Sequence, residues 1–113
     1  MIEHSLLDRT YGALADATRR GMLVTLRDGS ARITDLAAPL PISFAAAARH
    51  VGVLEAAGLI EREVRGRDHW LTVHAAGLRP AEEWIAEQVS FWSARADALA
   101  ARLERRNRPE ARP

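Results

Sequence analysis

The stretch from Ile33 to Val73 reads ITDLAAPLPISFAAAARHVGVLEAAGLIEREVRGRDHWLTV. Its first half carries two short helical patterns, and its second half carries two runs of bulky and β-branched residues around Arg65-Gly66-Arg67-Asp68. The spacing of apolar residues changes from helical to strand-like between the two halves. The stretch therefore predicts two helices followed by a β-hairpin with a basic tip.

Capping residues set the expected bounds of the two helices. Thr34 is the expected cap of a short first helix, which Pro39 and Pro41 stop because proline disrupts a helix interior. Ser43 caps the second helix, expected over Ser43–Ala57, and Gly58 stands where a glycine commonly ends a helix. The stripe of this helix that faces the core is predicted to be Ala47, Val51 and Leu54.

The hairpin is expected from its composition. Leu59–Val64 and His69–Val73 are the predicted strands, and the four residues Arg65–Asp68 form the loop between them. Gly66 permits the tight bend that such a loop requires.

Helices are also expected on both sides of this stretch. Residues 3–15 place Leu7, Tyr11 and Leu14 at helical spacing, and a second helix follows the capping residue Asp16 and ends at Gly29. A long helix is predicted from Pro80 to about Arg106, because its apolar residues recur at alternating steps of four and three. These residues form a seam that requires a partner helix: Ile85, Val89, Trp92, Ala96, Leu99 and Leu103.

The expected order is therefore α-α-α-α-β-β-α, mainly α with a β-hairpin wing, which is the layout of a winged helix-turn-helix. A groove-sized helix beside a cationic loop is what a reader of duplex DNA needs. The length of 113 residues predicts one domain. We expect it to span residues 1–106 and to combine DNA binding with dimerisation, followed by a disordered polar tail over 107–113.

Composition excludes several classes of protein. The chain has no cysteine, so it has no disulfide, thiolate metal site or cysteine nucleophile. It has no apolar run of the roughly 20 residues that a membrane helix needs, and its first residues lack the pattern of a secretory signal. A cytoplasmic location is expected. The net charge of +1 says little about partners, although all 16 basic residues are arginine.

Several motifs carry a resemblance to a known family. The run ALADATRRGMLVTL, from Ala13 to Leu26, resembles the opening of the ArsR-type winged-helix repressors. The hairpin GLIEREVRGRDHWLTV resembles the wing of that family. Further matches, which extend the resemblance over residues 5 to 103, are Asp35-Leu36-Ala37, Arg49-His50, Val53-Leu54-Glu55, Ala57-Gly58, Leu78-Arg79-Pro80, Glu83-Trp84 and Phe91-Trp92. The last three resemble the metal-independent branch.

The resemblance implies a homodimeric transcription regulator that places its fourth helix in the major groove and dimerises through its first and last helices. The implied DNA-contacting residues of that helix are Ser43, Phe44, Ala45, Arg49 and His50. Arg49 is the expected main reader of a base or a phosphate. The family often has a serine at position 48 and a basic residue at position 52, where this chain has Ala48 and Gly52.

The wing residues Arg62, Arg65, Arg67 and His69 are the expected contacts to phosphates or to the minor groove. The alternative is a solvated hairpin, because arginines and carboxylates balance between Ser43 and Val73. For Arg19 and Arg20, a phosphate contact and a structural salt bridge are both open.

The residues expected at the dimer interface lie on the first and last helices. They are Leu7, Tyr11, Trp84, Ile85, Val89, Trp92, Leu99 and Leu103. Trp84 and Trp92 could instead line a small-molecule pocket in that interface. No metal site and no cofactor is expected, because the four histidines show no ligand spacing and the last helix contains none. Nothing resembles a catalytic centre, so we do not expect an enzyme.

We therefore expect a sequence-specific repressor of its own operon that binds a pseudo-palindromic operator on double-stranded DNA as a homodimer. Two alternatives remain open. One is a winged-helix module that binds protein and no specific DNA, which Ala48, Gly52 and the balanced charge favour. The other is a DNA-binding repressor gated by a small organic ligand at the dimer interface.

Overall fold

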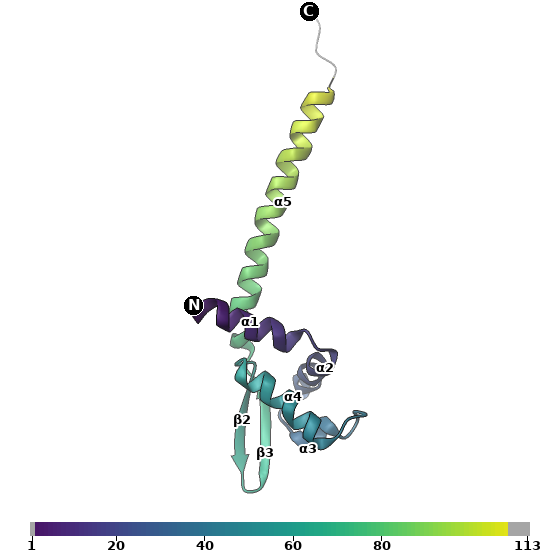
Figure 1. The fold of residues 1–113 in the computed structure, drawn as a ribbon, viewed down its shortest axis with the longest axis vertical. Helices are drawn as coiled ribbons and strands as arrows, with labels where there is room; N and C mark the ends of the chain where they lie inside the picture. Colours follow the sequence, from purple (N-terminus) through teal and green to yellow (C-terminus); the bar gives the residue numbers. More distant parts are fainter. Residues whose placement is uncertain (1, 109–113) are drawn as a thin grey trace, which may run out of the picture. The chain divides into compact units, whose positions relative to one another are not determined.

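A computed structural model of the protein describes residues 2–108 (Figure 1). The chain divides after Ala81 into two compact units, which we describe separately. The first unit contains α1 (Ile2–Leu14), α2 (Ala17–Thr25), the 3-10 helix η1 (Leu26–Asp28), β1 (Ala31–Arg32), α3 (Ile33–Ala37), α4 (Phe44–Ala56), β2 (Ile60–Arg65), β3 (Asp68–Val73) and the 3-10 helix η2 (Ala75–Leu78). The last helix, α5 (Arg79–Asn107), begins in the first unit and makes up the described part of the second.

Three predicted capping residues are confirmed. The side chain of Asp16 accepts a hydrogen bond from the backbone N–H of Arg19, and that of Ser43 accepts one from Ala46, each at 3.1 Å. Gly58 ends α4 with a φ of 75°, in the left-handed region that favours glycine. Asp16 and Ser43 thus satisfy backbone donors that the first turn of a helix leaves unpaired.

The predicted start of the third helix is wrong. Helix α3 begins at Ile33, and Arg32 is its N-cap residue. The carboxylate of Asp35 accepts a hydrogen bond from the backbone N–H of Arg32 at 3.0 Å, as the third residue of a capping box does. Thr34 therefore lies inside the first turn and does not cap it.

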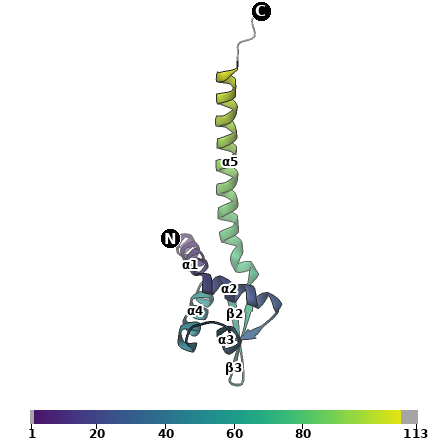
Figure 2. The same cartoon turned by 90° about the vertical axis from the view of Figure 1, so that its right-hand side faces the viewer.

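The sheet has three strands in the order β1-β3-β2, all antiparallel (Figure 2). Strand β1 was not predicted; it pairs Ala31 with Leu71 and Arg32 with Trp70. The predicted four-residue loop is also wrong, because Arg65 and Asp68 are themselves paired in the ladder. The turn is Gly66-Arg67, and the φ of 62° at Gly66 explains the glycine.

The core joins α4 to the sheet. Ala47, Val51 and Leu54 are fully buried, as their spacing predicts, and they share one cluster with Leu59 and Leu71. Burial of this stripe leaves the opposite side of α4 free to face outward. The β2–β3 hairpin reaches beyond α3 in both views (Figures 1 and 2).

Helix α5 runs from Arg79 to Asn107, close to the predicted Pro80–Arg106. Residues 109–113, which cover most of the predicted disordered tail, lie outside the described residues. Across residues 2–108, each helix is too short or too polar to cross a membrane.

Candidate nucleic-acid interface

The N-terminal half of α4 presents small and apolar side chains together with one arginine. Phe44 is 55% exposed, and Ala45 and Arg49 are exposed as well. Ala47 is fully buried, and helical spacing places Ala45 and Arg49 on the side of α4 away from it, with Phe44 at the edge of the buried stripe. Ser43, Phe44, Ala45 and Arg49 therefore form an outward surface at the start of α4.

The start of α4 lies beside the tip of the wing. Phe44 and Arg67 line the same shallow cavity of about 90 Å³, together with Arg32, Ile33, Thr34, Asp68 and His69. The fold thus brings two of the predicted sites together, although they are more than twenty residues apart in the sequence. A helix start and a hairpin tip in this arrangement can contact neighbouring parts of one DNA duplex.

Among the arginines predicted to contact DNA, Arg49 and Arg67 are the two whose charged groups can bind a ligand directly. Among the side chains of residues 5–108 that the structure describes, neither guanidinium forms a hydrogen bond or an ion pair. Both side chains are exposed. Either can therefore bind a phosphate or a base edge without first breaking a contact in the protein.

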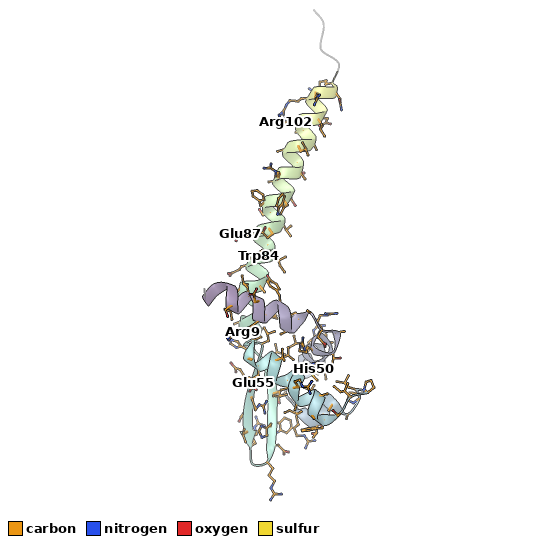
Figure 3. All side chains as sticks on the ribbon, viewed as in Figure 1. Arg9, His50, Glu55, Trp84, Glu87 and Arg102 are labelled. Carbon is orange, nitrogen blue, oxygen red and sulfur yellow. The ribbon has the colours of Figure 1, made fainter. Side chains whose placement is uncertain are left out.

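Arg62 has a different role. Its Nε and Nη2 donate to the carboxylate of Glu55 on α4, at 3.1 and 2.9 Å, and its Nη1 donates to Nδ1 of His69 at 3.0 Å (Figure 3 labels Glu55). The side chain is only 25% exposed. Arg62 therefore connects the wing to α4, and both Arg62 and His69 already have partners within the protein.

Arg65 is paired within its own strand. Its guanidinium donates to both carboxylate oxygens of Glu63 at 3.1 Å and lies 5.5 Å from the ring centre of Trp70. The hydrogen bond from Arg65 holds the pKa of Glu63 below its ordinary value, and the same bond raises the pKa of Arg65. Residues two apart on a strand share a face, so this pairing could have been foreseen from the sequence.

The two arginines of α2 make contacts that the sequence did not reveal, and one of them reaches His50. Arg19 donates from Nε to the carbonyl of Ala13 at 2.8 Å, from Nη2 to Gly12 at 3.0 Å and from Nη1 to Nδ1 of His50 at 3.1 Å (Figure 3 labels His50). Arg20 donates to the carbonyl of Leu14 at 2.7 Å. Both arginines therefore donate to carbonyl groups of the last turn of α1, where a helix leaves carbonyls without partners in its own ladder.

The residues predicted for the dimer interface differ in exposure. On α5, large apolar side chains remain about half exposed: Trp84, Ile85, Val89, Trp92, Leu99 and Leu103. Leu7 and Tyr11 on α1 are partly buried. The hydroxyl of Tyr11 donates to the carbonyl of Ala81 within the same chain, at 2.7 Å.

Among residues 5–108, whose side chains the structure describes, no group of three or more His, Asp and Glu side chains is placed to hold a metal ion. The prediction that the chain has no metal site stays a prediction.

The fold and these sequence features have known counterparts. No family model matches the chain. An ArsR-family transcriptional regulator of known crystal structure shares 31% sequence identity with this chain, and the two structures superpose with a TM-score of 0.75. The match covers 79% of this chain and 92% of that one. This chain belongs to the ArsR family. The resemblance inferred from the motifs is thereby confirmed.

Other relatives are consistent with this membership in the ArsR family. The HTH-type transcriptional regulator Rv2034 of Mycobacterium tuberculosis is 42% identical over 53 residues. That match covers 47% of this chain and 50% of Rv2034, so the chain matches half the length of this curated relative. A homodimeric winged helix-turn-helix DNA-binding domain from Mycobacterium bovis is 23% identical, with a TM-score of 0.59, over 76% of this chain and 78% of that one. Its likeness confirms the winged helix-turn-helix fold.

Proposed function

We propose that this ArsR-family protein is a sequence-specific DNA-binding repressor of its own operon that binds a pseudo-palindromic operator as a homodimer. The observation that carries the proposal is that the start of α4 lies beside the wing tip. Each of the two elements also carries an exposed arginine. Arg49 and Arg67 supply these charges. Two neighbouring elements then contact one duplex, which fixes the orientation of the protein on DNA.

The exposed residues of α4 divide into two kinds of contact. Arg49 donates to a guanine or a phosphate, and Phe44 and Ala45 make apolar contacts with thymine methyl groups. Arg67 contacts phosphate or the minor groove. The remaining predicted contacts, Arg62, Arg65, His50 and His69, support these elements from within the protein.

The dimer is supported by the apolar side of α5. Large exposed apolar side chains on one helix mark a surface that associates with another protein. Val89, Trp92 and Leu99 follow the steps of three and four that bring two helices together in a seam. The Mycobacterium bovis domain, which shares the fold, is itself homodimeric. A two-fold dimer would present two copies of α4 to successive major grooves.

We further propose that no metal ion controls this regulator. The thiolate sites of metal-responsive relatives require cysteines, and the chain has none. Titration with zinc or nickel should change neither the melting temperature nor the affinity for DNA. A tight, saturable shift of either quantity contradicts this part of the proposal.

The deciding experiment is a selection of bound sequences from a random duplex pool with the purified full chain. We expect enrichment of an inverted repeat, and we expect the logarithm of the affinity to fall steeply with the logarithm of the salt concentration. A reporter joined to the protein's own promoter then tests repression, which should be lost in Arg49→Ala. Failure to enrich any sequence contradicts the proposal.

A protein-interaction module is the second candidate. The observation that favours it is the internal neutralisation of Arg62 by Glu55 and of Arg65 by Glu63. This reading predicts no enriched duplex and no dependence of DNA affinity on Arg49 or Arg67. The same selection therefore separates the two candidates.

A further inference from the structure

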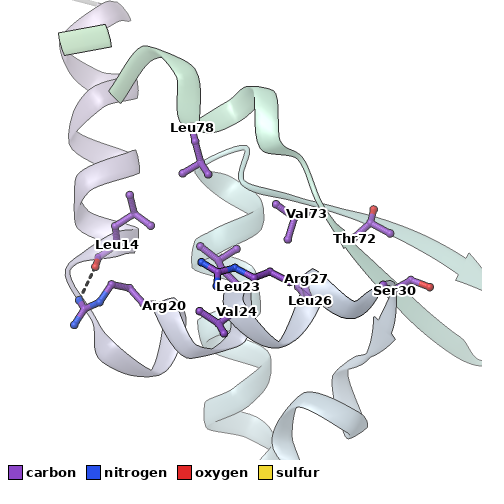
Figure 4. A pocket seen from close by; sticks show the side chains of 11 residues that line it. Leu14, Arg20, Leu23, Val24, Leu26, Arg27, Ser30, Thr72, Val73 and Leu78 are labelled. Carbon is purple, nitrogen blue, oxygen red and sulfur yellow. Dashed lines mark hydrogen bonds between the residues drawn. The ribbon is translucent and has the colours of Figure 1, made fainter. Parts of the chain in front are cut away.

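The first unit contains a cavity of about 590 Å³ that lies outside the candidate interface (Figure 4). Pockets that bind small molecules in proteins measure roughly 300–1,000 Å³ and are mostly apolar. The apolar part of this lining comes from α1, α2, η1, β3 and η2: Leu14, Leu23, Val24, Leu26, Val73 and Leu78. None of the lining residues belongs to α4 or to the hairpin turn.

The charged side chains of the lining are all positive. Arg20 and Arg27 contribute to it, and no Asp or Glu does. One nitrogen of Arg20 donates to the carbonyl of Leu14 (Figure 4), and neither arginine forms an ion pair with any carboxylate among the described side chains of residues 5–108. Ser30 and Thr72 add hydroxyl groups. An occupant that complements this lining has an apolar body and one anionic end.

We propose that this cavity binds a small apolar carboxylate, of the class of a medium-chain fatty acid anion, with Arg20 and Arg27 holding the carboxylate. We also propose that this ligand changes the affinity of the protein for DNA. The second part rests on the proposed function, whereas the binding site does not.

Short connections lead from the lining to the wing and to α3, the helix before α4. Thr72 and Val73 belong to β3, which pairs along its whole length with β2 to form the wing. Ser30 directly precedes β1, whose residue Arg32 is held by Asp35 at the start of α3. A ligand that shifts β3 or Ser30 therefore acts on the wing and on the helix before α4.

The binding test uses decanoate as the probe, below the concentration at which it forms micelles, and the full chain labelled with nitrogen-15 in the absence of DNA. We expect saturable shifts of the backbone amide signals of Leu23, Val24, Thr72 and Val73. Decan-1-ol, which has the same chain without the charge, should bind about tenfold more weakly. Shifts that do not saturate, shifts confined to α5, or equal binding of the alcohol overturn the site.

Two variants identify the contacts. Arg20→Ala combined with Arg27→Ala should remove the preference for decanoate over decan-1-ol, whereas Arg9→Ala, at an exposed arginine on α1, should retain it. Because Arg20 also binds α1, Val24→Trp provides an independent test: Val24 is half exposed, so a larger side chain can fill the cavity without disturbing the core. It should abolish decanoate binding. If Val24→Trp instead dissociates the dimer, a second copy covers this surface and the proposal is overturned.

The regulatory test uses the duplex enriched in the selection. Saturating decanoate should change the dissociation constant for this duplex at least about threefold, and the duplex should change the affinity for decanoate by the same factor. Unchanged DNA affinity in the presence of saturable decanoate binding overturns the regulatory part. If no duplex is enriched, the proposed function fails, while the titration without DNA still decides whether the site exists.

Discussion

Arg62 of β2 donates two hydrogen bonds to Glu55 of α4, at 3.1 and 2.9 Å. A third bond, to His69 at 3.0 Å, holds the same guanidinium against β3. The side chain of Arg62 thus connects α4 with the wing, the two elements that are proposed to contact DNA. Its role is to position the wing relative to α4.

This geometry predicts different consequences for two arginines of the hairpin. Arg62→Met should lower the free energy of unfolding by about 1 kcal/mol, because Glu55 and His69 lose their partner in a partly shielded position. Arg67→Met should leave stability unchanged, since Arg67 is exposed. Urea unfolding at one fixed protein concentration measures both effects. Equal stability of the two variants contradicts the positioning role of Arg62.

For the salt dependence of DNA affinity the order is reversed, and Arg67→Met should have the larger effect. Arg67→Met removes one phosphate contact, so it should weaken binding to all sequences alike and reduce the slope of log affinity against log salt by about 1. Arg62→Met should leave that slope unchanged. Fluorescence anisotropy of a labelled duplex across a salt series measures the slope, and an unaltered slope for Arg67→Met removes the wing tip from the interface.

Arg49 is the expected base or phosphate reader of α4. Arg49→Ala should weaken operator binding by about 1–3 kcal/mol. Arg95→Ala, at an exposed arginine of α5, is the matched control and should bind like the unaltered protein. A gel-shift titration of both variants on the selected operator is sufficient. If Arg49→Ala binds the operator with unchanged affinity, another residue reads the DNA.

The proposed dimer can be tested on α5. Val89→Glu places a charge among exposed apolar side chains and should convert the dimer to a monomer, because an unpaired carboxylate in an apolar seam is unfavourable. Ser90→Glu adds the same charge at the neighbouring position, outside the seam, and should remain dimeric. Sedimentation velocity separates the two species. A dimeric Val89→Glu variant would mean that the subunits associate elsewhere.

A lower pH should reduce the free energy of unfolding, because it protonates Asp16, the N-cap residue of α2. The backbone N–H of Arg19 donates to Asp16 and holds the pKa of that carboxyl below its ordinary value of 3.8. The lowered pKa means that this contribution to stability is complete above about pH 4 and is lost as the pH falls toward the folded-state pKa. Asp16→Asn keeps a capping acceptor but cannot titrate, so its unfolding free energy should fall less between pH 5 and pH 3 than that of the unaltered protein. An equal loss of unfolding free energy in the variant and in the unaltered protein would contradict the role of Asp16.

Gly77 is required by a close approach of the backbone. A Cβ atom at this position would overlap the carbonyl oxygen of Gly58, which follows α4. Gly77→Ala should therefore destabilise the protein by about 1–3 kcal/mol. Gly12→Ala is the control, because a Cβ there meets nothing within 4 Å and alanine favours a helix by roughly 0.5–1 kcal/mol over glycine. Thermal unfolding should move in opposite directions for the two variants.

Much of the fold was predictable because its signals are local. The caps Asp16 and Ser43 act within three residues, Gly58 shows the left-handed end of a helix, and the buried stripe of α4 follows from helical spacing. Strand β1 was missed because two residues are too few to show alternation. Thr34 was mistaken for a cap because any Thr before an apolar run resembles one, whereas Asp35 decides where α3 begins.

The candidate site was less predictable because charge balance does not specify partners. The sequence shows equal numbers of arginines and carboxylates between Ser43 and Val73, but only the packing of α4 on the hairpin brings Arg62 to Glu55. Arg19 reaches His50 across 31 positions of the chain. The cavity lined by Leu14, Leu23 and Val73 likewise requires elements that are far apart in the sequence.

The three hydrogen bonds of Arg19 have a mechanical consequence. They join the last turn of α1 to the middle of α4 through one planar group. Because Arg19 itself belongs to α2, a movement of α1 would break its bonds to two carbonyl oxygens and a movement of α4 would break its bond to the imidazole, so the guanidinium couples both helices to α2. In the proposed dimer on α1 and α5, a shift at the subunit contact would then reach α4 through α2 and would change the operator spacing that the protein accepts.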